Sequence, residues 1–360
     1  MIYFYFFFAT LGLGSLAAVR RYGLQLFIAC SFVLFLLFLS LRWETGTDWY
    51  SYYEFFQQLD NYRMFEIGYV FENNLVRMFT NSFTVFLIIN SFFALLPIFY
   101  FLKKEARRLA PLGLLFFYSY YYLITYFGSD RRIIAIGFCF TAAFAILYGR
   151  MWLGLLLIVL GGCFHSSAGL CLLYFPLASS SAMQRFYIRI GIAFGILVAL
   201  GFAFYQQLLA IDIIAHPLLQ FAYYLNPELT PPPAGYNLFL VSLLSMTKRS
   251  VILFFILISV RYLKLNDMKT KFFVRSYVFS YVLYLVSILT VNLFDTFTIY
   301  FSIFEIILVP RIISHYKGYT RVLIILVFVC YLLLQTYNAT EGNPYATLYL
   351  PYRWIGGTLN

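Results

Sequence analysis

Two pairs of adjacent cations begin long apolar runs in this chain, Arg131–Arg132 and Lys248–Arg249. A Lys or Arg near the middle of a membrane span costs about 2.5 to 3.5 kcal/mol, and less at its edge. Such a residue binds an anion, pairs with an acid, or extends its charged end to the phosphates of the outer lipid leaflet. The last explanation suits a single residue better than two adjacent pairs. The pairs therefore predict recognition of an anionic group.

Asp48 lies in a polar and aromatic segment that follows the second apolar run. Gly46 breaks the helix there, and Thr47 or Asp48 can begin a new one by accepting hydrogen bonds from free backbone N–H groups. The aromatic residues that follow favour a helix lying in the membrane interface. Asp48 is thus either a helix cap or a carboxylate held at the membrane surface, where it can accept the proton of a hydroxyl group.

His165 stands between two short apolar runs, residues 151–164 and 166–180. Its ring can simply satisfy the end of a broken helix. Its ordinary pKa near 6.5 also suits a general base or a hydrogen-bond donor to phosphate. His216 and His315 are in loop positions that indicate no such role.

These residues must be positioned by a chain that is largely apolar. Hydrophobic residues make up 63% of its 360 residues and charged residues 11%, whereas a soluble domain is about a quarter charged. Runs of about 17 to 25 apolar residues predict membrane-spanning helices, and the alternation of a barrel strand is absent. We expect an all-α, polytopic integral membrane protein of about 12 transmembrane helices in a single domain, residues 1–360. The expected spans are residues 2–19, 24–41, 81–102, 111–127, 133–149, 151–164, 166–180, 187–208, 240–262, 275–294, 297–314 and 322–338.

Charge fixes the sidedness of these spans. Counting residues 151–164 and 166–180 as two crossings places most loop cations on one side, which is then cytoplasmic. The net charge of +11 reflects these loops, so no nucleic-acid partner is expected. The outer face carries both chain ends and three larger pieces with amphipathic helices, residues 42–80, 209–239 and 339–360. The cations expected there against the charge bias are Arg42, Arg63, Arg77, Arg131, Arg132, Lys248, Arg249 and Arg353.

Several common sites are missing from the sequence. There is no P-loop, no dinucleotide-binding glycine pattern, no HExxH and no DxD pair. The five cysteines form no CxxC pair, and no His and Cys residues have metal-ligand spacing. We therefore expect neither a cofactor nor a metal.

Five short motifs give the chain a resemblance to the EpsG-like, Wzy-type polysaccharide polymerases of bacterial envelopes. The resemblance runs over most of the chain. Arg132 stands where that family usually has Gln, which leaves open how this position binds its ligand. The matching residues are Arg42, Gly46, Asp48, Tyr52 and Tyr53; Glu66, Gly68, Tyr69 and Asn73; Arg131 to Ala135; Phe164, His165, Ser167 and Ala168; and Pro351 and Tyr352.

The resemblance implies a membrane fold like that of the C-type glycosyltransferases and an inverting, metal-independent transfer. A growing glycan leaves undecaprenyl pyrophosphate and joins a sugar hydroxyl of another lipid-linked repeat unit. The leaving group needs cations, and guanidinium groups match phosphate oxygens. The catalytic residues would be Arg131 with Asp48 or His165 as the base, a choice that stays open. The substrate-binding candidates are Arg42, Arg132, Tyr52, Tyr53, Glu66, Lys248, Arg249 and Arg353.

The same resemblance implies a place in the bacterial inner (cytoplasmic) membrane, with the active site facing the periplasm or exterior. The partners implied are undecaprenyl-pyrophosphate-linked oligosaccharides and the lipid bilayer, with a chain-length regulator and a flippase as further candidates.

Three other functions remain open from the sequence. A transporter or flippase of lipid-linked sugars would share the spans and cations, but it would more often show internal repeats and mid-span charges. Asp295 and Glu305 are the only acids near such positions, which counts against it. A membrane O-acyltransferase with His165 as base, and a glycan ligase with a different acceptor, are the other two.

Overall fold

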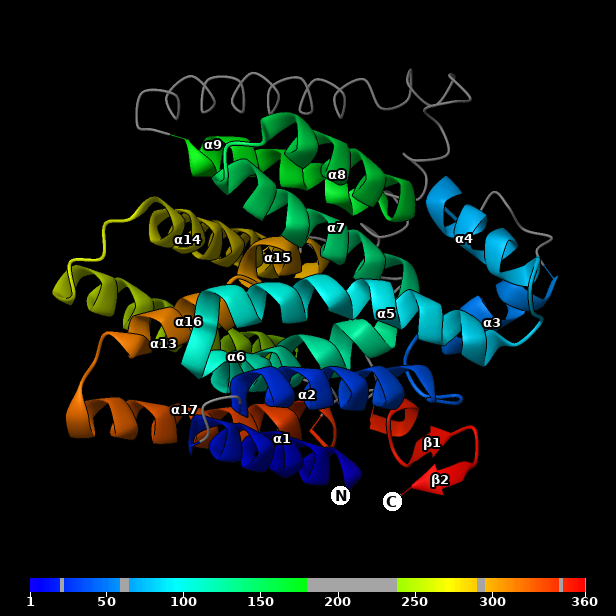
Figure 1. Ribbon diagram of the computed structural model, residues 1–360, viewed down its shortest axis with the longest axis horizontal. Coiled ribbons are helices and arrows are strands. Elements are labelled where there is room, and N and C mark those ends of the chain that lie inside the picture. The colour runs from blue at the N-terminus through cyan, green and yellow to red at the C-terminus, as the bar shows by residue number, and fades with distance from the viewer. Residues whose placement is uncertain (20–22, 59–64, 180–237, 290–294, 343–345, 360) are drawn as a thin grey trace. The chain divides into compact units, whose positions relative to one another are not determined.

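The chain is helical apart from one short β hairpin, over the residues that the structure describes. The computed structural model describes residues 1–19, 23–58, 65–179, 238–289, 295–342 and 346–359 (Figure 1). They form two compact units. The first unit comprises Met1–Leu172, Ser259–Leu265 and Ile303–Asn360, and the second comprises Leu173–Ile258 and Asn266–Ser302.

The first unit holds most of the long helices and the hairpin. Its elements are α1 (Ile2–Val19), α2 (Gly23–Ser40), α3 (Trp49–Gln58), α4 (Ile67–Arg77), α5 (Phe83–Phe101), α6 (Ala110–Phe117), α7 (Asp130–Leu147), α8 (Met151–Phe164), α16 (Glu305–Ser314), α17 (Gly318–Ala339), β1 (Tyr352–Trp354) and β2 (Gly357–Leu359). The second unit holds α9 (Tyr174–Ala178), most of α13 (Leu238–Tyr262), α14 (Met268–Leu289) and α15 (Asp295–Ser302).

Long apolar helices make the chain an integral membrane protein. Among the described residues, four helical stretches are long and apolar enough to cross a membrane: Gly23–Ser40, Phe83–Tyr126, Phe297–Ser314 and Gly318–Ala339. Shorter apolar helices cover Ile2–Ser15, Met151–Phe164 and Ser166–Ala178. Twelve crossings stay a prediction, because the expected span 187–208 and most of the outer segment 209–239 lie outside the described residues.

The stretch Phe83–Tyr126 runs out along α5 and back along α6, as two expected spans require. A π-helical turn over Leu102–Ala106 ends at Arg107, whose φ of 49° redirects the chain. The chain has returned to the start of α5 by Asp130, because the Nδ2 of Asn90 in α5 donates to the Asp130 carbonyl at 3.3 Å. The returning arm becomes π-helical over Tyr118–Tyr126. The Tyr118 hydroxyl of this arm is satisfied within the protein, since it donates to the Tyr3 carbonyl of α1 at 2.8 Å.

A helix break occurs at His165, where two short helices were expected to meet. The helix α8 ends at Phe164, and His165 is extended, with φ −154° and ψ 120°. The chain then continues as a 3₁₀ helix over Ser166–Leu173 before α9. The second short helix therefore begins with a tighter winding than an α-helix.

The C-terminal segment pairs with the loop that precedes α3. Strands β1 and β2 are antiparallel, and the backbone N–H of Trp43 donates to the carbonyl of Arg353 at 2.8 Å. Gly46 N–H donates to Leu348 at 2.9 Å in the same way. The Tyr3 hydroxyl at the start of α1 donates to the Tyr349 carbonyl at 2.7 Å. Both chain ends thus lie at one end of the first unit, where Figure 1 marks N and C.

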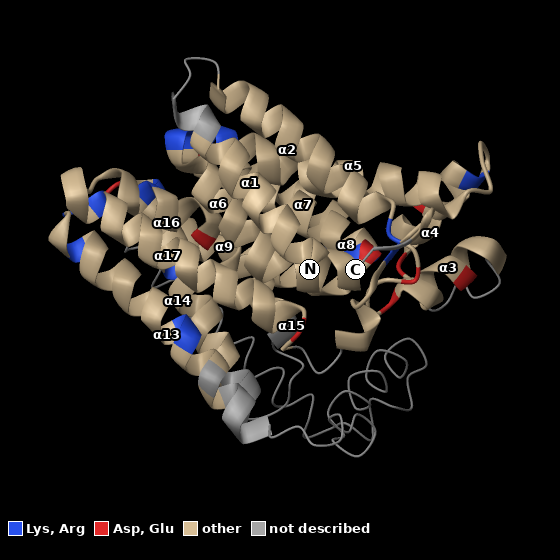
Figure 2. Cartoon of the chain, turned by 90° about the horizontal axis from the view of Figure 1, so that it is seen from below, with Lys and Arg blue, Asp and Glu red and all other residues tan. Residues whose placement is uncertain are grey.

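The two ends of the first unit differ in charge. Figure 2 shows acidic residues, together with basic ones, around α3, α4 and the C-terminus. Basic residues follow the far ends of α5 and α7, and the Tyr148 hydroxyl joins these two turns by donating to Glu105 at 2.8 Å. By the positive-inside rule the basic end is expected to be cytoplasmic and the acidic end outer. The basic residues are Lys103, Lys104, Arg107, Arg108 and Arg150.

Candidate active site

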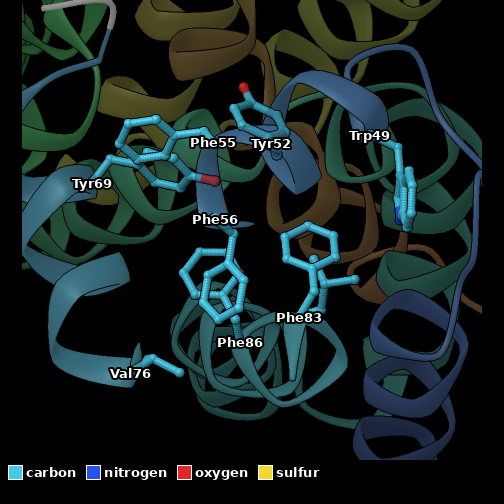
Figure 3. Close-up of a cluster of buried hydrophobic side chains, with 9 residues drawn as sticks. Trp49, Tyr52, Phe55, Phe56, Tyr69, Val76, Phe83 and Phe86 are labelled. Carbon is cyan, nitrogen blue, oxygen red and sulfur yellow. The ribbon is translucent and has the colours of Figure 1, made fainter. Parts of the chain in front are cut away.

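An aromatic cluster fixes two short amphipathic helices, α3 and α4, onto the start of α5 (Figure 3). On α3 the buried residues follow helical spacing, so one face is apolar and packs inward. On α4 the buried face carries Tyr69 and Val76. Because both helices are anchored in this way, the residues just before them are held in place. The cluster comprises Trp49, Tyr52, Phe55, Phe56, Tyr69, Val76, Phe83, Phe86 and Leu87.

Asp48 stands directly before α3, after a turn that only glycine allows. Gly46 has φ +114°, and a Cβ there would lie 2.0 Å from the carbonyl oxygen of Phe127. The Asp48 side chain is exposed, and its backbone carbonyl begins α3 by accepting from Tyr52 N–H at 3.2 Å. Desolvation by the surrounding chain raises the pKa of the Asp48 carboxyl, while a hydrogen bond from Thr47 and the nearby Arg132 oppose the shift.

Arg131, Glu66 and Tyr52 meet at the start of α7. The Arg131 guanidinium forms an ion pair with Glu66 and donates from Nε to the Tyr52 hydroxyl at 3.4 Å. It also lies over the ring of Phe65, 4.8 Å from its centroid. The second carboxylate oxygen of Glu66 accepts from the backbone N–H of Ser166 at 3.1 Å. Glu66 therefore links the first turn of α7 to the residue after His165.

Gly68 allows this link by letting α4 approach the end of α8. A Cβ at Gly68 would lie 2.8 Å from the carbonyl oxygen of Cys163 and 2.9 Å from the ring of Phe164. Any larger residue would push α4 outward and carry Glu66 away from Ser166. The Glu-x-Gly spacing thus has a physical reason in this chain.

His165 is a neutral hydrogen-bond donor in this arrangement. Its Nδ1 accepts from the backbone N–H of Ser167 at 3.3 Å and lies 2.6 Å from the Ser167 hydroxyl. Because a backbone N–H can only donate, the ring hydrogen must be on Nε2. Desolvation, followed by the charges of Arg132 and Arg131, lowers the pKa of His165 to about 3.

Arg132 has no hydrogen-bond or ion-pair partner among the described residues. Its side chain is half-buried, and its Nε is fully covered without an acceptor. The charge of Arg132 lowers the pKa of both Asp48 and His165, so Arg132 lies within electrostatic range of both groups. A partly desolvated cation that has no direct ion-pair partner among the described residues is unfavourable, so this position suits an incoming anion.

Arg42 is more deeply buried than Arg131 and Arg132 and already has an ion-pair partner. Its Nη2 is 2.5 Å from a carboxylate oxygen of Asp130, and its Nη1 donates to the Leu39 carbonyl at 2.9 Å. Both side chains of the pair are only 1% exposed. The pair therefore holds the start of α7, which begins at Asp130, against the end of α2. Asp130 was not among the expected site residues, although an acid directly before two arginines is a signal for such a partner.

A second polar contact supports the same helix end. Asn90 donates from Nδ2 to Glu72 at 3.1 Å as well as to the Asp130 carbonyl. Desolvation raises the pKa of Glu72 to about 8, while the Asn90 hydrogen bond opposes the shift and the charge of Asp130 adds to it. Sequence spacing did not single out Glu72 or Asn90, because they come from different helices.

The remaining expected residues lie at the rim or in the second unit. Tyr53 stacks on Trp49, with ring centroids 5.0 Å apart, on a different face of α3 from Tyr52. Arg353 forms an exposed ion pair with Glu44 at 2.5 Å. In the second unit, Arg249 lies 3.8 Å from the ring centroid of Tyr284. Lys248 precedes Arg249 on α13 and also belongs to the second unit.

The arrangement brings two guanidinium groups, a neutral imidazole donor and a carboxylate to one end of the first unit. Among the described residues, no three His, Cys, Asp or Glu side chains gather so as to hold a metal ion. The model of the EpsG family matches residues 25–354, which is most of the chain. No curated protein and no solved structure matches the chain.

Proposed function

Because this chain belongs to the EpsG family, and hence to exopolysaccharide biosynthesis, we propose that it is a Wzy-type membrane polymerase. It moves a growing glycan from undecaprenyl pyrophosphate to the non-reducing sugar hydroxyl of another lipid-linked repeat unit, at the outer face of the membrane. One observation supports the proposal: Arg132, beside Arg131, has no partner in the described part of the chain and acts electrostatically on a carboxylate and a neutral imidazole.

The two arginines bind and stabilise the diphosphate. Guanidinium groups donate two parallel hydrogen bonds to phosphate oxygens, and the N-terminus of α7 adds the positive end of its helix dipole. The Nε2–H of His165 is a third donor. As the anomeric C–O bond breaks, its electron pair passes to the diphosphate, where these donors stabilise the developing charge.

Asp48 serves as the base in this mechanism. The acceptor oxygen bonds to the anomeric carbon from the side opposite the diphosphate, which inverts the configuration, and its proton passes to Asp48. A raised pKa makes the Asp48 carboxylate a better proton acceptor than an ordinary Asp carboxylate. His165 is the weaker acceptor, because its pKa is low and its Nδ1 is occupied by Ser167.

The reaction is tested with purified full-length protein in lipid vesicles, lipid-linked repeat units and a chelator. We expect a ladder of polymers on a gel. Activity should rise with pH through a pKa above the ordinary value for Asp, with no inflection near 6.5 from His165. A requirement for an added divalent metal would contradict the role of the arginines.

The roles of the two candidate bases are separated by matched substitutions. His165→Gln keeps an N–H donor near the position of Nε2, so it should retain more activity than His165→Ala. Asp48→Asn should lower the rate about 100-fold or more, as loss of a general base does. Equal loss in both His165 variants, with Asp48→Asn active, would make His165 the base instead. Repeat units trapped at the cytoplasmic side in Arg131→Ala cells would favour a flippase.

A further inference from the structure

A pocket of about 320 Å³ opens on a different face of α3 from the arginines. Its side chains include the aromatic rings of Trp43 and Tyr53, the amides of Gln57 and Asn81, and the hydroxyls of Ser82 and Thr84. The volume lies in the range of small-molecule sites. Tyr53 and Gln57 are four residues apart and share one helix face, whereas Tyr52, about 100° around the helix, contacts Arg131.

The aromatic part of this pocket is held rigidly. Tyr53 stacks on Trp49 at an interplanar angle of 11°, and Trp43 meets Tyr53 at 69° with centroids 5.7 Å apart. Trp49 itself is 2% exposed and belongs to the aromatic cluster. Because these rings are fixed before any ligand arrives, binding orders few side chains and loses little entropy.

The polar part of the pocket is accessible and uncharged. Gln57, Asn81 and Ser82 are exposed, and an amide offers both donors and acceptors. None of the lining residues that the structure describes carries a formal charge. This composition differs from the arginine site, which suits an anion, and it matches a ligand with apolar ring faces and many hydroxyl groups.

We propose that this pocket binds an uncharged segment of oligosaccharide, away from the bond that reacts. The proposal deepens the polymerase function and rests on it for the identity of the sugar. Since α3 carries Tyr52 toward Arg131 and Tyr53 toward the pocket, the same helix contacts both regions. A glycan held there stays on the enzyme while its diphosphate end is exchanged.

Binding is measured with full-length protein in lipid nanodiscs, using lipid-free oligosaccharides of one, two and four repeat units released from the host polymer by partial acid hydrolysis. The double variant Gln57→Ala, Asn81→Ala should bind the longer probes about 5- to 100-fold more weakly, for two lost hydrogen bonds. Gln58→Ala is the matched control, because Gln58 is the exposed neighbour on α3 and does not line the pocket. It should bind like the wild type.

Polymerisation separates this inference from the function on which it rests. If the wild type makes polymer, the double variant should make shorter products while joining two single repeat units at the normal rate. If the wild type makes no polymer but binds the probes through Gln57 and Asn81, the function fails and the pocket stands. Wild-type binding and product length in the double variant, or equal loss in Gln58→Ala, would overturn the inference.

Discussion

Two ion pairs meet the first turn of α7, and they differ chiefly in depth. Asp130 pairs with Arg42, with each side chain 1% exposed, whereas Arg131 pairs with Glu66, with side chains 21% and 22% exposed. The buried pair is further tied to the Leu39 carbonyl. The pair of Arg131 and Glu66 is accessible to water and lies beside Arg132, which has no partner among the described residues.

The difference in burial indicates different roles for Asp130 and Arg131, which are adjacent on α7. A buried pair cannot exchange its partner without leaving a charge in a region that water does not reach. A pair that is about one-fifth exposed can exchange its partner, so a diphosphate can compete with Glu66 for Arg131 while Glu66 keeps its hydrogen bond to Ser166. The buried Arg42 therefore supports the site, whereas the more exposed Arg131 can bind a ligand.

Breaking the buried pair should have the largest effect. Arg42→Ala leaves Asp130 uncompensated, which should lower the free energy of unfolding by about 3–5 kcal/mol. The measurement is the unfolding midpoint of the detergent-solubilised protein. Replacing both partners, Arg42→Met with Asp130→Leu, should cost less than either single change. A single variant of wild-type stability would mean that the pair does not support α7.

Removing the unpaired cation should reduce activity and leave the fold intact. Arg132→Ala should lower the rate of polymer formation about 100- to 1,000-fold, the range for loss of a transition-state donor. Its unfolding midpoint should not fall, because no ion pair is lost. If Arg132→Ala instead lowered the unfolding midpoint and left the rate per folded molecule unchanged, Arg132 would have a structural role.

Displacing α4 should act between these extremes. Gly68→Ala places a methyl group within 2.9 Å of Cys163 and Phe164, and overpacking of this kind costs about 1–3 kcal/mol. Because Glu66 moves with α4, activity should fall together with stability. Activity is compared per folded molecule, and Ile67→Ala, at an exposed position on the same helix, is the control. Equal effects in both variants would count against the close approach.

The rim pair should matter least. Arg353 and Glu44 are 48% and 30% exposed, and exposed ion pairs contribute about 1 kcal/mol or less. Arg353→Ala should therefore shift the unfolding midpoint only slightly, and high salt should remove the difference. A large loss of polymerisation at constant stability would show that Arg353 contacts substrate and belongs with Arg132 functionally.

Local features of the fold could be predicted from the sequence. The helical membrane class follows from composition. Short motifs indicated the family, and the EpsG family model confirms that membership over residues 25–354. The break at His165 was visible because two short apolar runs meet there. The cap at Thr47 or Asp48 and the aromatic residues that follow likewise indicated a helix there, and α3 occupies that place.

Contacts between distant residues could not be predicted in the same way. Arg42 and Asp130 are 88 residues apart, and no local pattern links them. The expected span 297–314 is divided between α15 and α16, because the helix is interrupted at Ile303 and Phe304. Neither residue is Gly or Pro, and the proline of this span, Pro310, lies inside α16. The pocket near Tyr53 needs Asn81 and Thr84 from another loop, which helix periodicity does not indicate.

The pairing of the C-terminal segment with the loop before α3 has a consequence for biosynthesis. Thr45 bonds to Arg353, which is made 308 residues later. During translation the loop that bears Asp48 therefore lacks this partner until Arg353 has left the ribosome. On the proposed function, a nascent chain already inserted in the bilayer would not yet catalyse glycan transfer during this interval.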